Sequence, residues 1–348
     1  MGNTLATAKT EVSELATAFG ITYGRLSPIR LWREELRIPG IPDAQVRVQV
    51  ALLNWNKGDD IYDVFNLALE NGNLFRKKIL RDESPSKIAW TGSKKGKHRR
   101  WLPDDLVVND EVLISVKFDS TTWFNLSPEA LFVDLLQEET YEAADDWYSI
   151  IAPQEYKAFF QVVLRCLHSE GKATTIRSAK PQDMNKNDKR HLKEAIATWG
   201  KNLPEPAAEA YERFCEVISQ KSLECWGINL LGAGPQAATN MFLRLIRIAE
   251  KPYWLLGASN GIPLRYRISS VEEWESYWCL EEFEVRYYPT GQPRVDWAAQ
   301  IEKIESQCST VVEGFCEIRW SRGKFQRPPE CKVHIKTSPG EIPGYEPF

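Results

Sequence analysis

The sequence contains few of the residues on which metal and redox sites depend. Its 348 residues include four histidines, His98, His168, His191 and His334, and none has the H-E-x-x-H spacing of a zinc hydrolase. The seven cysteines are odd in number and show no C-x-x-C spacing, which argues against a disulfide framework or a structural zinc site. We therefore expect reduced thiols, as in a cytoplasmic protein.

Long apolar runs are missing as well. No stretch approaches the roughly 18 apolar residues of a membrane span, and residues 1–10 lack the apolar core of a signal peptide. The G-x-S-x-G turn that carries the nucleophilic serine of many hydrolases does not occur either. These features predict a soluble, cytoplasmic globular protein with no membrane partner.

The net charge of −4 gives no overall attraction to polyanions, so any such binding must come from local basic patches. Three patches are present, and each is also compatible with a solvated loop. The first contains Lys94, Lys95, Lys97, Arg99 and Arg100; the second contains Lys186, Lys189, Arg190, His191 and Lys193; the third contains Arg319, Arg322, Lys324 and Arg327.

The segment directly after the first patch is predicted to form a β-hairpin. Two β-rich runs, 106–108 and 112–118, flank Asn109-Asp110, a pair that favours tight turns. Because side chains alternate along a strand, Ser115 and Lys117 share one face, opposite the apolar residues at 112, 114 and 116. Asp104 or Asp105 enters that face from the neighbouring strand, and we prefer Asp105.

This arrangement, Pro103-Asp104-Asp105 followed by Ser115-Val116-Lys117, resembles the PD-(D/E)xK nuclease superfamily, to which many restriction endonucleases belong. In that family an Asp on one strand and an acidic-x-Lys on the next hold one or two Mg²⁺ beside the scissile phosphate. The resemblance covers residues 59 to 137. Ser115 departs from the pattern, because Asp or Glu is usual there; some restriction enzymes with Ser-x-Lys take the missing carboxylate from the following helix.

The resemblance implies roles for particular residues. Mg²⁺, with Mn²⁺ as a substitute, would be held by Asp105, by Glu129 or Glu70, and by a backbone carbonyl near Val116. Glu129 follows Lys117 by twelve residues, in the first turn of a helix predicted to run to residue 137 with Ser127 as its N-cap. Glu70 lies on an earlier helix predicted at 59–70, which Asn71-Gly72 would end.

Lys117 and Ser115 complete the predicted catalytic group. Lys117 would orient the attacking water or stabilise the charge of the pentavalent transition state, and Ser115 would hydrogen-bond to the groups that hold the metal. The resemblance thus implies a sequence-specific, metal-dependent endonuclease of the type II restriction kind. Its partner would be double-stranded DNA, and an enzyme that cuts both strands of a palindrome is usually a homodimer.

The basic patches then acquire expected roles. The first patch, which adjoins the hairpin, would hold the phosphate backbone. The third patch would read base edges, since arginine is well shaped for guanine in the major groove.

The predicted fold class is α/β (α+β), with a mixed central sheet of the restriction-endonuclease-like type. Residues 1–150 would form the nuclease-like core, 151–250 a helical region, and 251–348 a strand-rich region that completes the sheet and contributes to DNA recognition. The run 253–256 is apolar on both faces, as expected for a buried strand. Other strands are predicted at 87–91, 264–268, 283–288, 311–320 and 331–335, and helices at 4–19, 152–169, 186–200, 205–222 and 236–250.

Several alternatives stay open. Glu330-Cys331-Lys332 also has the acidic-x-Lys spacing, with Glu317 on the preceding strand as its partner. The first hairpin is also compatible with an edge hairpin whose Lys and Asp are merely solvated. At the level of the whole protein, the alternatives are a non-catalytic nucleic-acid-binding protein and a protein–protein adaptor of a defence or mobile-element system.

Overall fold

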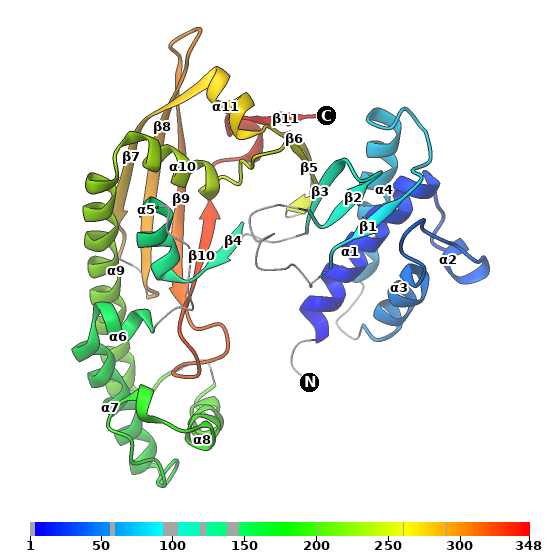
Figure 1. Cartoon of the computed structure of the whole chain (residues 1–348). Helices are drawn as coiled ribbons and strands as arrows, with labels where there is room; N and C mark the ends of the chain where they lie inside the picture. Colours follow the sequence, from blue (N-terminus) through cyan, green and yellow to red (C-terminus); the bar gives the residue numbers. More distant parts are fainter. Residues whose placement is uncertain are drawn as a thin grey trace. The chain divides into compact units, whose positions relative to one another are not determined.

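The chain forms two units, each assembled from separate segments of the sequence. The structure, a computed structural model, describes residues 4–55, 60–92, 104–118, 123–137, 146–200, 202–259, 261–289 and 291–348. The first unit comprises residues 1–121, 246–278 and 338–348, and the second comprises 122–245 and 279–337. Within the described residues the fold is mixed α/β, with one sheet in each unit (Figure 1). The boundaries therefore differ from those predicted at residues 150 and 250.

The first unit has a six-stranded mixed sheet with the order β1-β2-β3-β5-β6-β11. Strand β3 pairs in parallel with β5, and the other neighbouring strands are antiparallel. Its strands are β1 (Ile88–Trp90), β2 (Leu106–Val108), β3 (Val112–Phe118), β5 (Tyr253–Ser259), β6 (Ile262–Ile268) and β11 (Tyr345–Pro347). Its helical segments are α1 (Thr4–Tyr23), α2 (Arg30–Arg33), α3 (Ala44–Leu53), α4 (Asp60–Lys78), α11 (Val271–Tyr277) and η4 (Pro339–Glu341).

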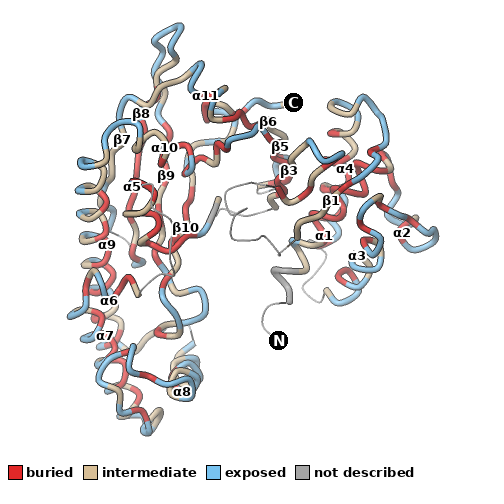
Figure 2. The backbone as a smooth tube through the Cα atoms, in the orientation of Figure 1, coloured by how far each residue is buried: buried red, intermediate tan, exposed pale blue. Residues whose placement is uncertain are grey.

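Helices α1 and α4 cover one face of this sheet, and the apolar core lies between them and the strands (Figure 2). The two helices meet backbone to backbone at a pair of glycines. A Cβ atom on Gly20 would lie 2.2 Å from the carbonyl oxygen of Leu69, and one on Gly72 would lie 2.2 Å from that of Thr17. Glycine is therefore required at the crossing, because any side chain would force the helices apart.

This crossing explains why α4 continues past the predicted stop at Asn71-Gly72. The helix ends at Lys78 instead, since Gly72 is used for close packing rather than for a left-handed cap. The intrinsic cost of about 1 kcal/mol for an interior helical glycine is offset by the contact that it permits.

The second unit has a five-stranded sheet with the order β4-β10-β9-β8-β7, in which β4–β10, β10–β9 and β9–β8 are antiparallel. Its strands are β4 (Phe124–Leu126), β7 (Trp278–Tyr287), β8 (Arg294–Lys303), β9 (Ser309–Arg319) and β10 (Glu330–Ile335). Its helical segments are η2 (Ala130–Asp134), α5 (Leu135–Gln137), α6 (Trp147–Ile151), α7 (Pro153–Ser169), η3 (Pro181–Asp183), α8 (Lys186–Ala197), α9 (Glu205–Ala233) and α10 (Pro235–Leu245).

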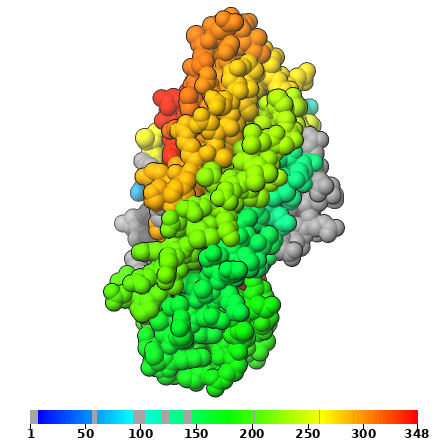
Figure 3. All heavy atoms as spheres, turned by 90° about the vertical axis from the view of Figure 1, so that its left-hand side faces the viewer, coloured from blue at the N-terminus to red at the C-terminus, as the bar shows by residue number. Residues whose placement is uncertain are grey.

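Helices α9 and α10 cover one face of the second sheet through aromatic contacts. The ring of Trp226 on α9 lies 5.6 Å from that of Phe283, and Phe242 on α10 lies 6.4 Å from Trp297. In Figure 3 helix α9 crosses this side of the unit as a yellow-green band beside the orange strands. Helix α9 extends to Ala233, beyond the predicted end at residue 222. Two residues of this extension are held by tertiary contacts: Trp226 is fully buried, and the side chain of Asn229 donates to the carbonyl of Phe132 at 3.0 Å.

The other face of the second sheet carries an ion-pair cluster around Asp296. Asp296 on β8 is 7 % exposed and accepts hydrogen bonds from the guanidinium of Arg294 and, at 2.5 Å, from the Nζ atom of Lys336. Burial by itself raises the pKa of Asp296, but the bonds and charges of these two cations outweigh it. The net pKa therefore lies below the usual value for an aspartate.

The strand predictions divide between the two sheets. Strands predicted at 253–256 and 264–268 do join the first sheet, as β5 and β6. Those predicted at 283–288, 311–320 and 331–335 form the second sheet instead, so the prediction that they complete the first sheet was wrong. Residues 294–303, which were not predicted as a strand, supply β8, and β7 to β10 then pair with their sequence neighbours as antiparallel strands commonly do.

Two expectations from composition can be compared with the structure. All seven cysteines are free thiols, as predicted. No helix in the described part of the chain is both long and apolar enough to cross a membrane.

Candidate functional site

The predicted hairpin is present and has the predicted bounds. Asn109 and Asp110 both have positive φ angles, 52° and 61°, and the amide of Glu111 donates to the carbonyl of Val108 at 3.1 Å. This is the turn geometry that asparagine and aspartate tolerate best in a tight hairpin. The side-chain oxygen of Asn109 also accepts from the amide of Ser86 at 2.9 Å, which ties the turn to the preceding segment.

The hairpin lies inside the sheet rather than at its edge. Strand β3 is flanked by β2 on one side and by parallel β5 on the other. Ser115 is 0 % exposed and Asp105 is half-buried. The alternative of an edge hairpin was therefore wrong, because β3 has a paired strand on each side. The buried Ser115 hydroxyl also needs a hydrogen-bond partner.

Asp105 supplies that partner. Its Oδ2 atom accepts a hydrogen bond from the Ser115 hydroxyl at 3.0 Å and another from the backbone amide of Val116 at 2.7 Å. Its own amide donates to the carbonyl of Ile114 at 2.9 Å. The carboxylate is thus fixed on the Ser115 face of β3, as predicted for Asp105. Asp104, the alternative, is 2 % exposed and its backbone carbonyl accepts from the Thr91 hydroxyl.

Lys117 shares this face, two residues and roughly 7 Å further along the strand. It pairs with Gly257 of β5, where a Cβ atom would lie 1.6 Å from the Lys117 carbonyl oxygen. The buried Asn71 of α4 donates to the Gly257 carbonyl at 2.8 Å. The backbone that carries Lys117 is therefore held in place by a close strand contact and by a helix.

Tyr253 borders the same face, because the next residue of β5, Trp254, pairs with Ile114 on the opposite face and side chains alternate along a strand. Burial raises the pKa of its phenol to about 12; the positive charge of Arg247 opposes this rise and the negative charge of Asp105 adds to it. The hydroxyl donates to the Arg247 carbonyl at 3.0 Å. Tyr253 thus stays neutral at physiological pH and shapes the environment of Asp105 without acting as a base.

The two glutamates expected to assist Asp105 belong to other parts of the fold: Glu70 to helix α4 and Glu129 to the second unit. Glu70 forms an ion pair with Arg265 at 2.7 Å, and Arg265 pairs with Leu256, whose side chain belongs to the core under α1 and α4. Directly opposed residues share a face of a sheet, so Glu70 lies on the face away from Ser115. Glu129 belongs to the second unit, where the predicted cap is present: Ser127 Oγ accepts from the amide of Ala130 at 3.1 Å.

The metal-ligand set that the first unit supplies is therefore small. No group of three or more His, Cys, Asp or Glu residues in the described ranges is arranged to hold a metal ion. Mg²⁺, however, is commonly bound by one or two carboxylates together with substrate phosphate and water. The fixed Asp105 carboxylate is a group that could serve in that mode, in which a bound phosphate completes the site.

The structure describes the residues of the third basic patch but not those of the first. Lys94, Lys95, Lys97, Arg99 and Arg100 lie outside the described residues. In the third patch, Arg322 and Arg327 are exposed, whereas Arg319 forms an ion pair with Glu317 at 3.2 Å.

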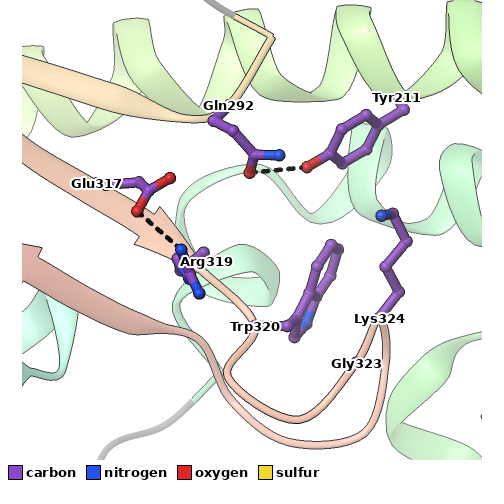
Figure 4. A pocket seen from close by; sticks show the side chains of 7 residues that line it. All are labelled: Tyr211, Gln292, Glu317, Arg319, Trp320, Gly323 and Lys324. Carbon is purple, nitrogen blue, oxygen red and sulfur yellow. Dashed lines mark hydrogen bonds and ion pairs between the residues drawn. The ribbon is translucent and has the colours of Figure 1, made fainter. Parts of the chain in front are cut away.

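Lys324 is directed into a pocket of about 210 Å³, where its ammonium lies 4.6 Å from the centre of the Tyr211 ring (Figure 4). Burial lowers the pKa of Lys324. Arg319 and Lys324 are thus engaged within the protein, whereas Arg322 and Arg327 are exposed and form no ion pair with any residue that the structure describes.

The second acidic-x-Lys motif lies on β10 in the second unit. Lys332 is directly opposite Glu317 of β9, as the alternative assumed, and Glu330 is opposite Arg319. Glu317 is already paired with Arg319 and lies 3.9 Å from the Nε2 atom of His334. Its charge is largely compensated within the protein, which makes this motif the weaker metal site.

Three contributors to the site were missed from the sequence: Asn71, Tyr253 and Gly257. Asn71 had been assigned to a helix stop, although an Asn next to a required Gly also fits a buried polar contact. Tyr253 lies in the apolar run 253–256 and Gly257 directly follows it, and no local pattern distinguishes either residue. Their roles depend on the parallel pairing of β5 with β3 across more than a hundred residues of sequence.

Comparisons with known proteins gave no match: no protein-family model, no curated protein and no solved structure is similar to this chain. The functional interpretation therefore depends on the geometry of the hairpin and its surroundings.

Proposed function

We propose that this chain is a divalent-metal-dependent DNA endonuclease with a PD-(D/E)xK-like core of the Ser-x-Lys kind, acting as a homodimeric, sequence-specific type II restriction enzyme. One observation carries the proposal. The Asp105 carboxylate is fixed by the Ser115 hydroxyl and the Val116 amide, on the face of an interior strand that also carries Lys117.

The chemistry follows from this arrangement. Hydrolysis forms a bond between a water oxygen and phosphorus and breaks one ester P–O bond, and the departing oxygen takes up a proton. A carboxylate has about four acceptor positions, enough for the two bonds that Asp105 makes and for a metal ligand. Mg²⁺ bound there would polarise the phosphate and lower the pKa of the attacking water.

Lys117 has a separate role in the proposal. Its ammonium would donate to the attacking water or to the phosphate oxygens, on which negative charge increases in the transition state. Ser115 would act through Asp105, because its hydroxyl fixes one carboxylate oxygen. Groups held in place in this way lower the reaction barrier mainly because they do not have to reorient as charge develops in the transition state.

The topology supports the same proposal. An antiparallel β1-β2-β3 unit is followed by an insertion of more than a hundred residues, after which β5 extends the sheet in parallel to β3. This is a mixed sheet with the acidic and Lys strands adjacent, as the restriction-endonuclease-like fold requires. Such an insertion is a natural place for recognition elements, since it leaves the catalytic strands unchanged.

The test is cleavage of a broad panel of methylated and unmethylated duplex DNAs with Mg²⁺ or Mn²⁺, with EDTA as the control. We expect cleavage with metal only, and none from Asp105→Asn. Glu330→Gln serves as the matched variant and should remain active. DNA that stays intact throughout the panel would argue against the proposal, and binding in EDTA without any cleavage would favour a non-catalytic DNA-binding protein. An inactive Glu330→Gln beside an active Asp105→Asn would place the active site on β10.

A further inference from the structure

Helix α8 of the second unit carries a basic stripe, defined as Lys186, Lys189, Arg190 and Lys193. The four positions are spaced i, i+3, i+4 and i+7, so they lie on one face of the helix. Three of the four side chains are exposed and Lys189 is half-buried, in a helix that buries Leu192. The side chain of Asn185 caps the helix by accepting from the amides of residues 187 and 188. The stripe is thus part of a well-formed helix.

The four cations of the basic stripe outnumber the two acids of α8, Asp188 and Glu194. None of the four cations forms an ion pair with a carboxylate in the part of the chain that the structure describes, whereas Arg319 in the same unit is paired with Glu317. Lys189 acts on Asp146 through its charge alone. Four like charges held along one helix face repel one another, so an external anion that binds there is favoured electrostatically.

The β9–β10 loop, residues 320–329, lies against α8 and extends the positive surface (Figure 1). The Nε2 atom of Gln326 donates to the carbonyl of Lys189 at 2.8 Å. Phe325 is 2 % exposed, and its ring lies 5.2 Å from that of Phe159 within an aromatic cluster. Because Phe325 anchors the loop, the exposed Arg322 and Arg327 on either side of it are held near the basic stripe.

Between the helix and the loop the surface is hollowed by about 540 Å³. The four cations of the stripe line this depression together with Met184, Asn187 and Gln326. Met184 is buried, so the apolar part of the exposed lining comes from the aliphatic stems of the lysine and arginine side chains, which end in charged groups. A protein partner usually needs an apolar or aromatic anchor in a pocket, whereas a phosphate chain needs only cations and polar groups.

We infer that the basic stripe of α8, with Arg322 and Arg327 of the β9–β10 loop, binds the phosphodiester backbone of duplex DNA. The choice of duplex DNA rests on the proposed function; the preference for a phosphate chain rests on the charge and lining of the depression. The stripe extends roughly 10 Å from Lys186 to Lys193, a length over which duplex DNA presents about six phosphates. This surface positions the DNA but carries no sequence information by itself.

The test measures binding of short duplex DNA in EDTA, where no metal-dependent cleavage occurs, as a function of salt between about 50 and 200 mM. One variant replaces all four cations of the stripe with Gln, which has nearly the same helix propensity as Lys and Arg. We expect the slope of log K against log salt to become shallower by about three to four, from about 0.9 per lost phosphate contact. The loss should be the same for unrelated sequences.

A matched control removes four cations from elsewhere in the second unit, on α7 and α9: Lys157→Gln, Arg165→Gln, Arg213→Gln and Lys221→Gln. It changes the net charge equally and should leave the slope unchanged. The loop variant, Arg322→Gln with Arg327→Gln, provides a second reading that does not alter α8. We expect it to reduce the slope by about two.

The inference would be overturned if the wild-type protein bound no duplex DNA at low salt, or if the stripe and loop variants kept the wild-type salt slope. It would also be overturned if a polyglutamate peptide bound the stripe while DNA did not. The last result would indicate an acidic protein partner. Failure of the proposed function is distinguishable. DNA binding through the stripe without cleavage in Mg²⁺ retains this inference and rejects the nuclease, and cleavage with unchanged binding by the stripe variant does the reverse.

Discussion

Two substitutions of Asp105 separate its contribution to folding from its contribution to chemistry. Asp105→Asn keeps the shape of the side chain and an oxygen that can accept from Ser115 and from the Val116 amide, but removes the negative charge. Asp105→Ala removes the acceptor as well. Both changes affect the same two hydrogen bonds, at 3.0 and 2.7 Å.

The expected losses of stability follow from these bonds. A hydrogen bond to a charged group contributes about 1.5–3 kcal/mol and a neutral one about 0.5–1.5 kcal/mol, so Asp105→Asn should lower the free energy of unfolding by about 2 kcal/mol. Asp105→Ala leaves the buried Ser115 hydroxyl and the Val116 amide without their acceptor, at about 1–3 kcal/mol each. Its total loss should therefore be about 2–6 kcal/mol, which exceeds the 0–1 kcal/mol expected for a solvated pair.

Urea unfolding of the wild type and both variants measures these differences, and cleavage is compared at a temperature where all three are folded. We expect Asp105→Asn to bind DNA in EDTA like the wild type but to lose turnover by orders of magnitude, with partial recovery in excess Mn²⁺. Lys117→Ala should be equally inactive. An Asp105→Ala protein as stable as the wild type would refute the hydrogen-bond argument. Undiminished cleavage by a folded Asp105→Asn would refute the catalytic one.

Two further predictions concern the packing of each unit. Gly72→Ala should lower the free energy of unfolding by about 1–3 kcal/mol in chemical denaturation, because its Cβ atom would overlap the α1 backbone. The control is Gly232→Ala, where a Cβ atom meets nothing within 4 Å, and it should be neutral or stabilising. Equal effects of the two substitutions would contradict the close crossing. The lowered pKa of Asp296 means that its contribution to stability is present above its unfolded pKa of about 3.9 and is lost as pH falls through the folded value. Urea midpoints measured from about pH 5 downward should therefore fall less steeply in Asp296→Asn than in the wild type, and parallel curves would show that the carboxylate is not held by its cations.

The sequence by itself determined the local elements of the candidate site. The turn at Asn109-Asp110 depends on two residues that tolerate positive φ, and the alternation along 112–118 places Ser115 and Lys117 on one face whatever the sheet around them. The apolar run at 253–256 also identified a strand buried on both faces. These features depend on neighbours in the chain, so periodicity and residue type are sufficient to find them.

Tertiary structure decided which of these elements meet. Three features depend on pairings between distant segments: the continuation of α4 through Gly72, the contact of Asn71 with β5, and the assignment of the later strands to a second sheet. No local sequence pattern contains the packing of such segments or the entropy cost of bringing them together. The same holds for the charges. Lys324 resembles Arg322 in the sequence, but it becomes half-buried against Tyr211 while Arg322 stays exposed. The next residue, Phe325, is buried in the aromatic core of the second unit, and this tertiary contact fixes the loop around Lys324.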